Sequence, residues 1–198
     1  MKILLTLSFI LSLTATGWSQ DFSKNITTAK NSYAGGNLED ARFAMEQMLN
    51  DIDMVIGREV LKMLPAKMET FTSNPKNDNV AANTGLAGVA IHRDYGTGEK
   101  ILNLDLMSNS PIVASINAIL SIPFMGNSGD GTQKIIKVEG YKAILQKSVD
   151  AESSKTNYTL QIPIGATLLT FTAPDTNEED VIRMANLIPI SQITKLVE

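Results

Sequence analysis

The only histidine of the chain, His92, is the first residue whose chemistry could serve a reaction. Imidazole titrates near neutral pH, so a histidine beside a carboxylate can act as a general base or bind a metal ion. Asp94 lies two residues further along, and Asp105 lies in the next strand-like segment. His92 with Asp105 or Asp94 therefore indicates a hydrolase or a metal-dependent enzyme. An exposed strand histidine without a catalytic role is the alternative explanation.

Other catalytic and metal-binding patterns are missing from the sequence. The chain has no cysteine, which excludes disulfides, thiolate metal sites and lipid attachment to cysteine. A single histidine excludes the paired-histidine zinc motifs, and no GxSxG segment occurs. The glycine-rich segment 126–131 lacks the Gly-Lys-Ser/Thr of a P-loop and the closing glutamate of an EF-hand. We therefore expect no cofactor, and the sequence favours a protein that is not an enzyme.

An apolar run leads into this glycine-rich segment from the helix expected after residue 110. The run contains Ile122, Pro123, Phe124 and Met125. Exposed apolar patches often mark sites for a partner or an apolar ligand. We predict that these four residues form a binding lip, while the alternative is that they close one end of the core.

Two segments with alternating apolar residues, 89–92 and 101–106, must position His92. Such alternation is typical of half-buried strands. The glycines of segment 95–99 predict a hairpin turn between the two strands.

The register of this hairpin follows from its apolar residues. If Tyr95 lies opposite Lys100, Ile91 faces Leu104, whereas a slip of one residue would place it opposite a polar side chain. This pairing sets His92 opposite Asn103, with Asp105 diagonal to it. We therefore include His92, Asn103 and Asp105 in a second candidate binding site.

The remaining pattern predicts an α+β domain. A helix follows Ser110-Pro111, four strand-like segments occupy 133–172, and an amphipathic helix starts near residue 177. Short connections favour antiparallel pairing. We expect the order β-β-α-β-β-β-β-α, an antiparallel sheet of about six strands with helices on one face, preceded by a helical hairpin.

The N-terminus predicts export. Residues 1–19 contain a lysine, a short apolar run and small residues before a cleavage point at Gln20, as in a signal peptide. We expect a soluble periplasmic or secreted protein, without stable membrane insertion after cleavage. The net charge of −4 on 198 residues, with no basic cluster, argues against nucleic acid as a partner.

The mature chain is expected to have three parts. Residues 20–70 predict a helical hairpin, because apolar residues recur at helical spacing on both sides of Gly35-Gly36. The asparagine-rich segment 71–84 predicts a linker, and residues 85–198 carry the sheet domain.

The hairpin resembles a single tetratricopeptide repeat. The likeness rests on Ala29, Tyr33, the segment 36–41 (GNLEDA) and Met48-Leu49. Nothing downstream repeats the pattern, and stable solenoids need about three repeats. The resemblance implies a helical hairpin of similar packing, without a peptide-binding groove.

The second half of the chain resembles uncharacterised exported proteins of Gram-negative bacteria and is similar to α+β domains of the PsbP type. The likeness rests on Arg93-Asp94-Tyr95, Asn109-Ser110-Pro111, Gly140-Tyr141-Lys142-Ala143 and the segment 178–190. It implies fold and export, and it brings no catalytic residues. From all these patterns we expect a non-enzymatic envelope protein that binds a protein partner or an apolar ligand.

Overall fold

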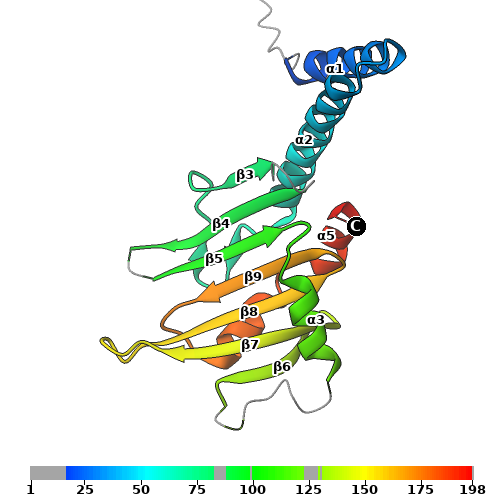
Figure 1. The fold of residues 1–198 in the computed structure, drawn as a ribbon. Coiled ribbons are helices and arrows are strands. Elements are labelled where there is room, and N and C mark those ends of the chain that lie inside the picture. Colours follow the sequence, from blue (N-terminus) through cyan, green and yellow to red (C-terminus); the bar gives the residue numbers. More distant parts are fainter. Residues whose placement is uncertain (1–16, 83–87, 99, 123–128, 130, 198) are drawn as a thin grey trace, which may run out of the picture. The chain divides into compact units, whose positions relative to one another are not determined.

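The computed structural model describes residues 17–82, 88–98, 100–122, 129 and 131–197, so most of the predicted signal peptide lies outside it. Figure 1 shows its helices and strands. The helices are α1 (Gly17–Ala34), α2 (Leu38–Met63), α3 (Val113–Ser121), α4 (Glu178–Ala185) and α5 (Ile190–Val197). The strands are β1 (Lys67–Met68), β2 (Phe71–Thr72), β3 (Asn79–Ala82), β4 (Val89–Thr97), β5 (Lys100–Met107), β6 (Gln133–Val138), β7 (Tyr141–Val149), β8 (Thr156–Ile164) and β9 (Thr167–Ala173).

The chain divides into two compact units, and the boundary lies inside α2, between Met48 and Leu49. The first unit holds α1 and the first part of α2, which belong to the helical hairpin predicted over residues 20–70. Its second helix begins where Asn37 caps it: the Asn37 side-chain oxygen accepts a hydrogen bond from the Asp40 N–H at 3.2 Å. Among the described residues, no helix has the length and apolar content needed to cross a membrane.

The second unit contains an antiparallel sheet in the order β3-β4-β5-β9-β8-β7-β6. The α+β class, the antiparallel pairing and the helical hairpin are confirmed. The sheet has seven strands rather than about six. The additional strand, β3, pairs with β4 along the edge of the sheet, with Val80 opposite Ile91.

The segment 71–84, which we predicted to be a linker, contains β2 and β3. Asn74 and Asn77 lie in the turn between these strands: the Asn74 N–H donates to the carbonyl of Asp94 at 2.9 Å, and Asn77 Nδ2 donates to the Asp94 carboxylate at 2.8 Å. The polar composition therefore marks a turn fixed by β4, and the linker prediction is corrected for the part of the segment that the structure describes.

The β4–β5 register differs from the expected one by two residues. Thr97 pairs with Lys100, and Tyr95 lies opposite Leu102. A two-residue connection fits the twist of the strands, and Gly98 supplies the positive φ of 74° that such turns need. Because the shift is even, every side chain stays on its predicted face.

The helices cover both faces of the sheet, so the expectation of helices on one face is corrected. The C-terminal part of α2, α4 and α5 cover the face of Leu102, Leu104 and Leu106. Helix α3 packs on the opposite face, against Ile144 of β7 and Leu168 of β9 (Figure 1). The physical reason is that these central strands carry consecutive apolar residues, which must be buried on both sides.

Candidate functional site

The structure brings His92 together with both carboxylates named as its partners. His92 lies directly opposite Asp105 in the β4–β5 pair, and Asp94 follows two residues later on the same face. His92 Nδ1 is 2.7 Å from Asp105 Oδ1, and His92 Nε2 is 2.9 Å from Asp94 Oδ1. Asn103 lies opposite Asp94, two pairs further along. The expected diagonal to Asp105 is therefore a direct pair, as the register shift requires.

This cluster sits in a polar row that crosses the sheet. Asn79, His92, Asp105, Thr170 and Gln161 are successive cross-strand partners on β3, β4, β5, β9 and β8. Side chains in such a row point to one face of the sheet. The described cavities, of about 150, 380 and 320 Å³, do not include His92, Asn103 or Asp105.

The electrostatics favour a protonated ring. Burial lowers the pKa of His92, but the hydrogen bond to Asp105 and the negative charges of Asp105 and Asp94 outweigh it, so that the pKa lies above its ordinary value of 6.5. A general base or a metal ligand needs a ring nitrogen with a free lone pair. Both nitrogens of His92 lie within 2.9 Å of a carboxylate oxygen. This arrangement suits an imidazolium that links two strands and two carboxylates.

Replacing His92 by glutamine should alter the pH dependence of stability. The folded-state pKa of His92 is raised, so its contribution is complete below about pH 6.5 and is lost as the pH rises through the folded-state pKa. The side chains of His92 and Asp105 are 33% and 52% exposed, which limits the contribution to about 1 kcal/mol. Thermal unfolding from pH 5 to 9 should show the two proteins converging in Tm at high pH. A difference in Tm that is independent of pH would contradict this assignment.

The predicted apolar lip is described only at its first residue. Ile122 follows α3 directly, and its side chain is 42% exposed. Pro123, Phe124 and Met125 lie outside the described residues. The structure does not place Ile122 in the His92 cluster, since α3 packs over β7 and β8 whereas His92 lies on β4.

The helical hairpin exposes large apolar side chains. Among the residues 21–48 of the first unit, whose burial the structure describes, the buried hydrophobic residues are all alanines: Ala29, Ala41 and Ala44. Its large exposed hydrophobic residues are Ile26, Tyr33, Leu38, Phe43 and Met45, with exposed fractions from 48% to 68%. This is the reverse of the usual distribution, in which large apolar residues are buried and small ones line the contacts.

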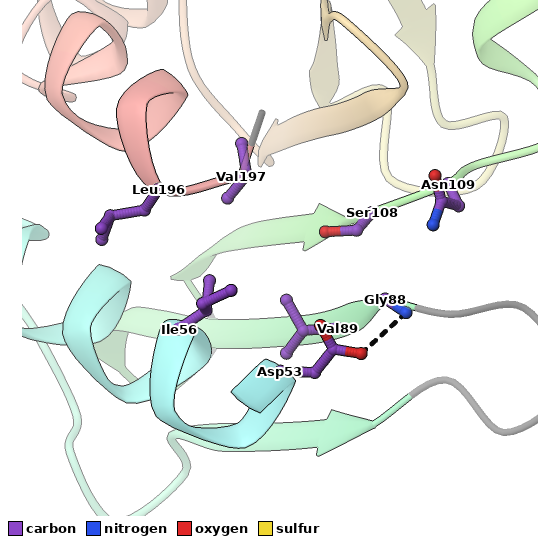
Figure 2. A pocket seen from close by; sticks show the side chains of 8 residues that line it. All are labelled: Asp53, Ile56, Gly88, Val89, Ser108, Asn109, Leu196 and Val197. Carbon is purple, nitrogen blue, oxygen red and sulfur yellow. Dashed lines mark hydrogen bonds between the residues drawn. The ribbon is translucent and has the colours of Figure 1, made fainter. Parts of the chain in front are cut away.

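A pocket of about 150 Å³ in the second unit was not predicted. Figure 2 shows Asp53 and Ile56 from α2 and Val89 at the start of β4, with the other lining residues around them. The complete lining is Asp53, Ile56, Gly88, Val89, Ser108, Asn109, Leu196 and Val197. In the sequence, Asp53 is an acidic residue between Ile52 and the apolar pair Val55-Ile56, a pattern that does not by itself indicate a pocket.

Asp53 is the acidic group of this pocket. Its Oδ2 accepts a hydrogen bond from the Gly88 N–H at 2.8 Å, drawn as a dashed line in Figure 2. Burial raises the pKa of Asp53, and the hydrogen bond from Gly88 opposes that shift. Within the described ranges, no group of three or more His, Cys, Asp or Glu side chains could hold a metal ion.

Comparison of the chain with protein-family models, with curated proteins and with solved structures finds no match.

Proposed function

We infer that the chain is an exported, non-enzymatic envelope protein that binds a protein partner through its helical hairpin, α1 with the first part of α2. Export rests on the predicted signal peptide over residues 1–19. The observation that carries the binding proposal is the reversed distribution of side chains in the first unit. Contacts made by three alanines bury little apolar surface, while five large apolar side chains stay in water.

A protein surface suits this feature better than a small apolar ligand. Small ligands bind in concave pockets, and the described cavities are all lined by residues of the second unit. The hairpin has little net charge, since residues 20–48 contain three basic and four acidic side chains. The expected partner therefore presents an apolar surface of low charge. The segment 122–125 stays a predicted second contact.

The alternative is a hydrolase or metal-dependent enzyme that uses His92 with Asp105 or Asp94. The close carboxylates on both ring nitrogens support it less than a structural role. The His92→Gln protein also tests this alternative. If this substitution abolished an enzymatic activity or metal binding and left Tm unchanged, the result would favour the enzyme over the binding protein.

Polar substitutions on the hairpin should abolish binding of the partner. Mature protein from Gln20 is crosslinked in the native envelope and recovered. The test protein carries three glutamines in place of exposed apolar residues on α2: Leu38→Gln, Phe43→Gln and Met45→Gln. Glutamine keeps helix propensity and removes apolar area, so helix content should be unchanged while the crosslinked species disappears.

A matched protein controls for the general loss of exposed apolar surface. It carries glutamine at three comparably exposed positions of the second unit: Met107, Val149 and Leu187, with exposed fractions of 43%, 60% and 46%. The proposal expects this protein to give the same crosslinked species as the unmodified chain. Equal recovery from all three proteins, or equal loss from both variants, would count against the hairpin as the binding surface.

A further inference from the structure

The pocket in Figure 2 combines one acidic group with four aliphatic side chains. Asp53 lies on α2, and Gly88, at the entry of β4, holds one of its oxygens through a backbone hydrogen bond of 2.8 Å. A carboxylate offers about four acceptor positions in all. A single N–H donor therefore leaves most of its hydrogen-bonding capacity unused and fixes the direction in which the carboxylate points.

The charge of Asp53 is not neutralised within the described part of the chain. Its hydrogen-bond donor is the neutral Gly88 amide, and no lysine or arginine contributes to its pKa, which burial raises. Partly buried carboxylates are normally paired with a cation or with several donors. This carboxylate lacks the cation.

The rest of the wall is partly aliphatic and partly polar. Ile56, Val89, Leu196 and Val197 form its apolar part, and Ser108 and Asn109 are polar lining residues. The volume of about 150 Å³ equals that of engineered cavities that hold a benzene molecule. The pocket therefore has room for about four to six heavy atoms, with a negative charge at one point of the wall.

We propose that this pocket binds a primary alkylammonium group on a chain of about four carbons, with the ammonium on Asp53 and the methylenes against Ile56, Val89 and Val197. The same chemistry occurs in a free aliphatic amine and in a lysine side chain. Anions are disfavoured by the charge of Asp53, and neutral alcohols leave that charge uncompensated. This site lies in the second unit and is independent of the hairpin surface.

The test is a titration of the isotope-labelled mature protein with n-butylamine at constant pH and ionic strength, followed by NMR. The Gly88 amide reports directly, because its N–H donates to Asp53. Saturable shifts are expected at Gly88, Val89 and Ser108, with the millimolar affinity typical of so small a ligand. Butanol and butyrate, matched in length, should give no saturable shift there. A lysine amide with a blocked amino terminus stands for a lysine side chain in a protein. Its binding distinguishes a lysine side chain from a free aliphatic amine as the ligand, because it binds only if the pocket admits a side chain attached to a backbone.

Substitutions then test whether the carboxylate of Asp53 binds the ammonium group. Asp53→Asn keeps an oxygen for the Gly88 N–H and removes the charge, so affinity for butylamine should fall at least about tenfold. Glu59→Gln removes a carboxylate from an exposed pair on the same helix and should leave the affinity unchanged. Val197→Phe, which fills the pocket, should also abolish binding and does not depend on the fold of the Asp53 variant. The proposal is overturned by equal binding of butanol, by equal effects of Asp53→Asn and Glu59→Gln, or by the absence of saturation at these amides.

Discussion

Replacing Arg93 by methionine is expected to lower the free energy of unfolding by about 3–5 kcal/mol, because it leaves a largely buried carboxylate without its cation. The Arg93 side chain is 10% exposed and its partner Asp78 is 14% exposed. Arg93 Nε and Nη2 donate to the two carboxylate oxygens of Asp78 at 2.9 and 2.5 Å. Such a bidentate pair is strong only while both members are present.

Arg93 also holds the end of α2. Its Nη1 donates to the carbonyl of Leu61 at 2.8 Å and to that of Leu64 at 3.4 Å. The last carbonyls of a helix have no partner within the helix. Arg93 therefore connects three elements of the second unit: the end of α2, the turn before β3 and strand β4. Methionine keeps the apolar stem of the side chain and removes all these bonds.

The measurement is denaturant unfolding followed by circular dichroism. Arg183→Met is the control, since Arg183 is 55% exposed and pairs with Asp180 and Glu69 on the surface. Its unfolding midpoint should stay close to that of the unmodified protein. Replacing Asp78 by leucine in the Arg93→Met protein removes the unpaired charge and should restore part of the stability. Equal losses for Arg93→Met and Arg183→Met would show that Arg93 does not carry this junction.

The alternation of apolar residues was sufficient to predict most of the sheet. Residues 141–148 and 167–172 were expected as strands, and they lie within β7 and β9. Alternation also placed Leu102, Leu104 and Leu106 on one buried face, where the structure has them. This periodicity depends only on local backbone geometry, so it predicts strands from the sequence without knowledge of tertiary contacts.

The predictions that were wrong concern features that depend on contacts between residues far apart in the sequence. Helix α3 lies on the face of the sheet that carries Ile144 and Leu168. The neighbouring residues Leu145 and Leu169 point to the other face. Consecutive apolar residues show that both faces are covered without showing which helix covers which. The polar segment before β4 became a strand because Arg93 and Asp94 bind it from β4, and composition alone does not contain that pairing.

The same distinction between local and distant contacts applies to the candidate sites. The proximity of His92 to Asp105 could be predicted because both lie in one hairpin, but the alternation left the register open by two residues, and Asn103 was the predicted direct partner. The pocket at Asp53 could not be predicted from the sequence, because its wall comes from α2, the entry of β4, the end of β5 and α5. An isolated acidic residue in an apolar stripe is common on helix surfaces, so Asp53 carried no specific signal in the sequence.

Gly57 provides the last expected result. Gly57→Ala should destabilise the protein by about 1–2 kcal/mol, although alanine in a helix interior is usually more favourable than glycine by about 1 kcal/mol. A Cβ at Gly57 would lie 2.3 Å from Val80 Cγ1 and 2.9 Å from Val89 Cγ2. Helix α2 therefore needs glycine here, because the side chains of Val80 on β3 and Val89 on β4 leave no room for a Cβ.

A double-mutant cycle with Val80→Ala isolates this contact. Val80→Ala alone should cost stability, because it removes half-buried methyl groups from the edge strand. In the double variant the new Cβ occupies the space that the valine methyls leave. We therefore expect a loss smaller than the sum of the two single losses by about 1 kcal/mol or more. Additive losses in denaturant unfolding would contradict a steric role for Gly57, and a stabilising Gly57→Ala would show that α2 and β3 separate at little cost.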